Sequence, residues 1–108
     1  MQVTDAIDPQ TLHARRAAGE RLVILDVREP WETALCVLPD SLVIPMSQIA
    51  ARLAELPATL PVVVVCHHGV RSAQVAAWLR SNGFPHTLNL SGGIDAWARA
   101  IDPAMRTY

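Results

Sequence analysis

Four consecutive valines, Val62 to Val65, constrain the fold of this chain more than any other stretch. A strand without polar alternation is buried on both faces, as in a parallel sheet that helices cover on either side. The sequence CHHG follows the valines directly, and a helical pattern then runs from about Arg71 to Asn82, where Gly83 stops it. A buried strand that leads straight into a helix is typical of an α/β domain.

The same alternation continues through the rest of the chain. A second buried strand is predicted at Arg21–Val27, and shorter strands are predicted at Leu42–Ile44 and Thr87–Leu90. Such an order predicts right-handed crossovers and a mainly parallel central sheet with helices on both faces. Besides the helix at 71–82, helices are expected from Asp8 to Gly19, from Ser47 to about Leu56, and after the Gly92-Gly93 pair.

Length and composition narrow the class of protein. A chain of 108 residues suits one domain and is too short for two, so residues 1–108 are expected to form a single domain. Its hydrophobic fraction of 51% and net charge of −1 argue against disorder and against a nucleic-acid-binding surface. No stretch resembles a signal peptide or a bilayer-spanning helix, and the two cysteines form no CxxC pair, so a reducing, cytoplasmic location is expected.

Cys66 comes directly after the valine strand, at the sheet edge where α/β proteins bind ligands. A cysteine in such a place is often only a small buried hydrophobe, but three features favour a reactive thiol. The free N–H groups at the start of the next helix stabilise a thiolate. Gly69 lets successive N–H groups converge on one point, and Arg71 carries a guanidinium that binds oxyanions through two parallel hydrogen bonds.

The segment after the valines resembles the active-site loop of the rhodanese family of sulfurtransferases. This loop has the pattern C-x4-R-S and consists of Cys66, His67, His68, Gly69, Val70, Arg71 and Ser72. Three other segments are similar to family motifs in the same order, namely Asp26-Val27-Arg28 with Glu32, PDSLVIP at 39–45, and SGGIDAW at 91–97. Each motif alone is weak, but four in the right order over residues 5–101 are strong.

The resemblance implies a reaction and a role for each part of the loop. Cys66 would be the catalytic nucleophile that carries a persulfide, residues 67–72 would bind the substrate, and Asp26 and Arg28 would support the site. The expected partners are a small sulfur donor, thiosulfate or a persulfide, and a thiol or cyanide as acceptor, with a sulfur-relay protein left open. No metal and no organic cofactor is needed for this chemistry, and no membrane or nucleic acid is implicated.

Two departures from the family pattern bear on the site. Many members carry an arginine or lysine directly after the cysteine, where this chain has His67 followed by His68. Neutral histidines would bind dianionic thiosulfate less well than a more basic loop. A zinc site made of Cys66 and both histidines is not expected, because adjacent side chains on a tight loop should diverge. Cys36 replaces part of another family motif, and we interpret it as structural rather than as a resolving thiol.

Two other functions are compatible with parts of this pattern. Phosphatases and arsenate reductases of related fold use a Cys-to-Arg loop with five intervening residues, whereas four residues separate Cys66 from Arg71. The shorter loop suits a single sulfur better than a tetrahedral phosphate. A non-catalytic binding module is the other alternative, but such domains have lost the cysteine, which this chain retains together with Gly69 and Arg71.

Overall fold

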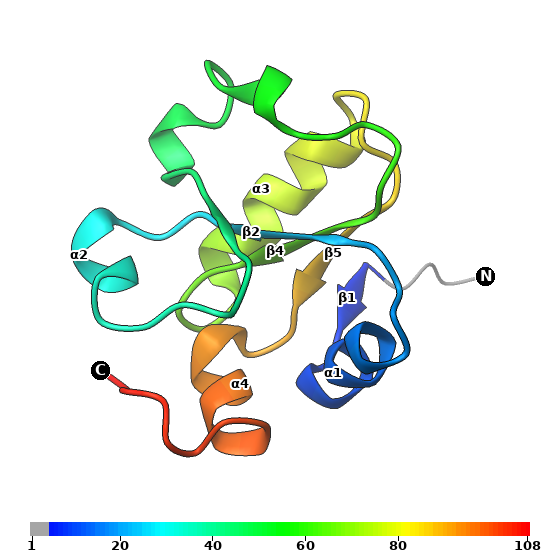
Figure 1. Cartoon of the computed structure of the whole chain (residues 1–108). Coiled ribbons are helices and arrows are strands. Elements are labelled where there is room, and N and C mark those ends of the chain that lie inside the picture. The colour runs from blue at the N-terminus through cyan, green and yellow to red at the C-terminus, as the bar shows by residue number, and fades with distance from the viewer. Residues whose placement is uncertain (1–4) are drawn as a thin grey trace.

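A computed structural model describes residues 5–108 of the chain. Within that range five strands form one sheet in the order β1-β5-β4-β2-β3, and every pairing between neighbours is parallel (Figure 1). The predicted mainly parallel sheet is therefore confirmed. The strands are β1 (Ala6–Ile7), β2 (Val23–Asp26), β3 (Leu42–Val43), β4 (Val62–Val65) and β5 (Thr87–Leu90).

Helices cover both faces of the sheet, as the alternation predicts. Helices α1 and α4 lie on one side, while α3 and the segment between β3 and β4 lie on the other (Figure 1). No helix within residues 5–108 is long and apolar enough to cross a membrane. The helices are α1 (Pro9–Ala17), α2 (Pro30–Thr33), α3 (Val70–Arg80) and α4 (Gly93–Ala100).

The sheet has one hydrophobic core on each face, and the four valines of β4 contribute to both cores. All four are completely buried. Successive side chains of a strand point to opposite faces, so Val62 and Val64 join the core on the α3 side, while Val63 and Val65 join the core beneath α4. This strand is buried on both faces, as its unbroken apolar run predicts.

The helix predicted between Ser47 and Leu56 is wrong. Two short 3₁₀ helices, η1 (Met46–Gln48) and η2 (Leu53–Glu55), stand in its place. A 3₁₀ turn places residues three apart on one side, which brings Ile49 with Met46, and Leu56 with Leu53, onto the α3-side core. This short segment thus buries its apolar side chains without forming the regular hydrogen-bond ladder of an α-helix.

The register of the sheet brings three chain segments to one edge. Val65 of β4 lies opposite Asp26 of β2, and Val64 lies opposite Asn89 of β5. Because the strands are parallel, the residues that follow β2, β4 and β5 all emerge at the same edge. Cys66 emerges there at the end of the central strand β4, between these two neighbours.

Candidate active site

The loop Cys66–Gly69 connects β4 to α3 and rests on the start of α4. The backbone N–H of Ile94 donates to the carbonyl of Cys66 at 2.9 Å, and that of Asp95 donates to the carbonyl of His67 at 3.1 Å. Gly93 allows this close approach, because a Cβ atom on it would lie 2.4 Å from the His67 oxygen. The tight turn predicted at the glycine pair therefore lies directly against the cysteine loop.

The Cys66 side chain is only 1% exposed, and hydrogen-bond donors surround its sulfur. The N–H of Gly69 and the hydroxyl of Ser72 each lie 3.1 Å from Sγ. Gly69 reaches this position with φ of +97°, in the left-handed region that favours glycine. The structure thus brings together the cysteine, the glycine turn and the helix start that the sequence singles out.

These donors set the acidity of the thiol. Burial acts to raise the pKa of Cys66, but hydrogen bonds from the Ser72 hydroxyl and from the N–H groups of Ser72, Gly69 and His68 outweigh it, so the pKa lies below its ordinary value. A lowered pKa increases the thiolate fraction at neutral pH, and the thiolate is the nucleophilic form.

Asn89, at the end of β5, is a site residue that sequence reasoning missed. Its Nδ2 donates to the Gly69 carbonyl at 3.0 Å, which turns its Oδ1 toward Ser72, and the Ser72 hydroxyl lies 2.5 Å from that oxygen. A hydroxyl carries one hydrogen, so Ser72 donates to the Cys66 sulfur, the contact that lowers the pKa of the thiol, only by releasing its hydrogen bond to Asn89. Asn89 reaches this place through the parallel pairing of β5 with β4. The residues next to it in the sequence do not mark it as part of a site.

Arg71 forms a two-pronged ion pair with Glu32 of α2. Its Nη1 and Nη2 atoms lie 2.7 and 2.9 Å from the two carboxylate oxygens of Glu32. The ion pair holds the pKa of Glu32 at about 2 and raises that of Arg71. The two donors that the sequence assigns to substrate oxygens therefore contact Glu32 in this structure, and they fix the start of α3 to α2.

Asp26 and Arg28 form a completely buried ion pair beside the loop. Nε and Nη2 of Arg28 both donate to the Asp26 carboxylate, at distances from 2.7 to 3.1 Å. Arg28 also donates to the carbonyl of Cys36 at 2.6 Å, and its Nη1 lies 3.8 Å from the half-buried sulfur of that residue. The pair holds the backbone around α2, which fits the supporting position expected for both residues.

His67 and His68 do not diverge, contrary to the geometry expected of a tight loop. Their rings stack with centroids 3.9 Å apart and an angle of 27° between planes. The other neighbour stacked on His67 is Tyr108, at 3.9 Å and 13°. Val70 projects outward and is 69% exposed.

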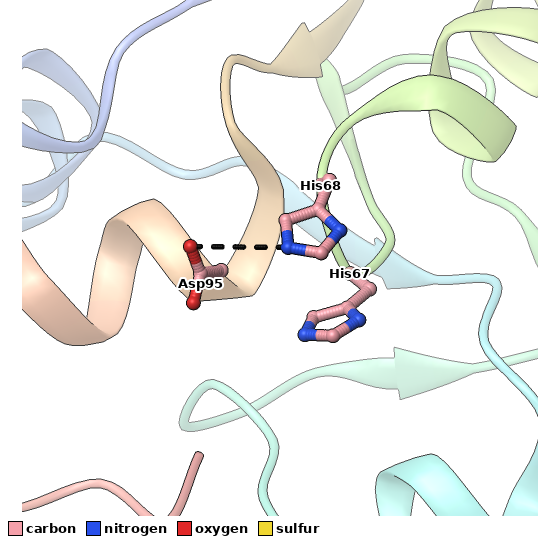
Figure 2. A group of neighbouring side chains, drawn as sticks. All are labelled: His67, His68 and Asp95. Carbon is pink, nitrogen blue, oxygen red and sulfur yellow. Dashed lines mark ion pairs between the residues drawn. The ribbon is translucent and has the colours of Figure 1, made fainter. Parts of the chain in front are cut away.

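Figure 2 shows His67 and His68 facing Asp95, which comes from α4. One ligand atom from each of these three residues lies within 4.8 Å of the others, a spacing from which side chains could converge on a metal ion. However, Arg99 already pairs with Asp95 at 2.9 Å, so a fixed positive charge lies beside the carboxylate. Nε2 of His68 lies farther away, 3.9 Å from the same Asp95 oxygen. The charge of Arg99 therefore disfavours a metal ion at this cluster.

Comparisons with known proteins agree on one family. The family model described as rhodanese-like domain matches residues 8–100. A protein named sulfurtransferase from Allochromatium vinosum is 41% identical over 97 residues, covering 90% of this chain and 91% of the relative. The thiosulfate sulfurtransferase GlpE of Pseudomonas syringae is 35% identical, with 84% of each chain covered.

Other similarities extend to a longer protein and to a solved structure. The probable adenylyltransferase/sulfurtransferase MoeZ of Mycobacterium tuberculosis is 36% identical over 94% of this chain, which spans only 26% of that protein. The crystal structure of a rhodanese-like domain protein from Staphylococcus aureus superposes with a TM-score of 0.82 at 33% identity, covering 87% of this chain and 91% of the other.

Proposed function

Because the chain belongs to the rhodanese-like domain family, we propose that it is a sulfurtransferase that moves a sulfane sulfur through a persulfide on Cys66. The observation that carries this proposal is the Cys66 sulfur held at the end of β4 by the Gly69 N–H and the Ser72 hydroxyl. Residues 1–108 would act as one domain. A reducing, cytoplasmic compartment suits this chemistry, because the thiol stays free there.

In the first half-reaction the Cys66 thiolate attacks the outer sulfur of the donor. With thiosulfate, a new S–S bond forms to Sγ as the old S–S bond breaks, and sulfite leaves with the electron pair of that bond. The products are a Cys66 persulfide and sulfite. The N–H groups that lower the pKa of the thiol would also donate to the added sulfur.

In the second half-reaction a nucleophilic acceptor attacks the terminal sulfur of the persulfide. Cyanide would leave as thiocyanate, and a thiol would leave as a persulfide, while the electron pair of the broken S–S bond returns to Sγ and regenerates the thiolate. Because the donor product leaves before the acceptor reacts, ping-pong kinetics are expected. After both half-reactions Cys66 is again a thiolate, so the enzyme has neither gained nor lost electrons over one full cycle.

The donor class follows from the charge around the loop. Glu32 neutralises Arg71, and the residue after Cys66 is His67 rather than a permanent cation. We therefore propose thiosulfate as a usable donor that binds weakly, and a persulfide of lower charge, free or on a relay protein, as the better one. The name of GlpE, a thiosulfate sulfurtransferase, supports thiosulfate as a usable donor, and the name of MoeZ supports sulfur transfer in general.

The phosphatase alternative has less support from this geometry. A phosphate dianion in a cysteine loop needs a free guanidinium as its clamp, whereas both terminal nitrogens of Arg71 contact Glu32. A non-catalytic module would not need a buried thiol whose pKa is held low. Sulfur transfer therefore accounts for more of the site than either alternative.

Thiocyanate release from thiosulfate and cyanide tests the proposal. We expect Cys66→Ser to lose activity by at least about a thousandfold, because the hydroxyl is a far weaker nucleophile toward sulfur. Cys36→Ser is the matched control, since it removes the other thiol, and it should keep most of the activity. Comparable activity in wild type and Cys66→Ser would contradict the proposed role.

A further inference from the structure

The segment from Met105 to Tyr108 brings an aromatic side chain to the cysteine loop from outside the matched family region. That region ends at residue 100. Tyr108 is nevertheless half-buried, and its ring and hydroxyl contact residues 40 or more positions away in the sequence. Met105 packs on the core beneath α4, which ties the segment down near its start.

The ring of Tyr108 completes a three-layer stack. His67 lies between Tyr108 on one face and His68 on the other, with centroid separations of 3.9 Å on each side. Trp31 of α2 packs edge-on against Tyr108 at 5.6 Å. Rings stacked on both faces leave the imidazole of His67 little freedom to turn, so its position relative to Cys66 depends on Tyr108.

The hydroxyl of Tyr108 joins the two ion pairs of the site. It donates to Oε2 of Glu32 at 2.7 Å and accepts from Nη1 of Arg28 at 2.9 Å. Burial, together with Glu32 and against the opposing effect of Arg28, raises the pKa of Tyr108 to about 12, so the hydroxyl remains a donor. The same Glu32 oxygen contacts Nη2 of Arg71.

We propose that Tyr108 is a positioning residue of the active site, whose ring holds His67 beside Cys66 and whose hydroxyl holds Glu32 on Arg71. Its consequence for substrate choice rests on the proposed sulfurtransferase function. A His67 that is kept half-buried and neutral lowers the positive charge at the loop and disfavours dianionic donors. Tyr108 thereby tunes the site toward sulfur donors of low charge.

The charges around His67 support this effect. Burial lowers the pKa of His67, and His68 acts in the same direction. A backbone hydrogen bond to Tyr108 and the carboxylates of Asp95 and Glu32 act in the opposite direction but do not outweigh it. Removing the ring of Tyr108 exposes the imidazole, so its pKa should rise toward the ordinary value of 6.5.

NMR titration of the histidine ring protons tests the placement directly, without any assay of sulfur transfer. We expect Tyr108→Ala to raise the pKa of His67, while Tyr108→Phe leaves it unchanged because the stacked ring remains. Thr107→Ala is the matched control, since Thr107 is an exposed neighbour in the same segment. The signals of His13 and His86 show that each variant is folded. A His67 titration in Tyr108→Ala that matches wild type overturns the proposal.

Steady-state kinetics with thiosulfate tests the consequence for catalysis. Tyr108→Phe should lower kcat/KM by about three- to tenfold, the range of a typical net hydrogen-bond contribution, because the hydroxyl no longer holds Glu32 on Arg71. In Tyr108→Ala the KM for thiosulfate should fall more steeply from pH 8 to pH 6 than in wild type, because a protonated His67 attracts the dianion. The same pH profile of KM in both proteins overturns the role in donor choice.

The two tests separate the two proposals. If wild type transfers no sulfur from any donor, the proposed function fails, while the NMR titration still decides whether Tyr108 holds His67. If wild type is active and Tyr108→Ala behaves like Thr107→Ala in both experiments, the function stands and the role of Tyr108 is refuted.

Discussion

Replacing Glu32 with glutamine should expose how strongly one ion pair ties the cysteine loop to the rest of the domain. Glu32 is 3% exposed, and it accepts from Arg71 through both oxygens and from the Tyr108 hydroxyl. Glutamine has the shape of a protonated glutamate but carries no charge. Glu32→Gln therefore removes the charge while changing little of the packing.

The size of the effect follows from the pKa of Glu32. Hydrogen bonds from Arg71 are the largest cause that lowers it from 4.5 to about 2. One pKa unit corresponds to about 1.4 kcal/mol, so ionised Glu32 contributes about 3 kcal/mol to the free energy of unfolding. Because the folded pKa lies below the unfolded one, this contribution is complete above pH 4.5 and is lost as the pH falls toward 2.

Urea denaturation of wild type and Glu32→Gln between pH 3 and pH 7, followed by tryptophan fluorescence, measures this contribution. The two free energies of unfolding should differ by about 3 kcal/mol at pH 7 and converge as the pH is lowered. Glu55→Gln is the matched control, because Glu55 forms the same two-pronged pair with Arg52 but is 45% exposed and screened by water. A constant difference across the pH range, or an equal loss in Glu55→Gln, would refute the reasoning.

Three further substitutions have expected outcomes. Ser72→Ala removes the hydroxyl 3.1 Å from the Cys66 sulfur, so alkylation of the thiol at pH 7 should slow by about tenfold and the pH profile of alkylation should move upward. An unchanged profile would contradict the account of thiol acidity. Gly93→Ala places a Cβ 2.4 Å from a loop carbonyl, whereas a Cβ on Gly83 meets nothing within 4 Å, and both have positive φ. Gly93→Ala should therefore destabilise the fold by more than the roughly 1–2 kcal/mol that the positive φ alone costs, which is the loss expected for Gly83→Ala. Equal losses of stability for the two variants in thermal denaturation would contradict the close packing of Gly93 on the cysteine loop. Arg71→Ala should lower kcat/KM for thiosulfate by about tenfold or more, because it leaves the buried Glu32 carboxylate without its cation and releases the start of α3 beside the cysteine loop. Arg80→Ala, on the same helix, should change kcat/KM little, and equal kinetic effects in the two variants would contradict this role.

Local patterns in the sequence were sufficient for the elements that carry the site. The valine run predicted β4 at its observed residues, because a strand buried on both faces needs an unbroken apolar stretch. The strand Thr87–Leu90 was also predicted at its observed residues. Asp8 begins α1 as expected, with its carboxylate accepting from the N–H of Thr11.

Long-range pairing accounts for what the sequence did not predict. The strand Ala6–Ile7 has only two residues and exists because it pairs with β5, so no local pattern marks it. Tyr108 lies 76 positions from Glu32, and only the packing of its segment against α4 brings the two together. The ion pair of Arg71 with Glu32 was not predicted either, because Glu32 lies 39 positions earlier in the chain.

The central claim is that Cys66 carries sulfur, and intact mass spectrometry tests it most directly. The protein would be incubated with excess thiosulfate, desalted, and measured before and after treatment with cyanide. The account predicts a gain of one sulfur atom that maps to Cys66, is absent in Cys66→Ser, and is removed by cyanide with release of thiocyanate. An unchanged mass with thiosulfate and with a low-charge persulfide donor alike, or sulfur on Cys36 alone, would contradict it.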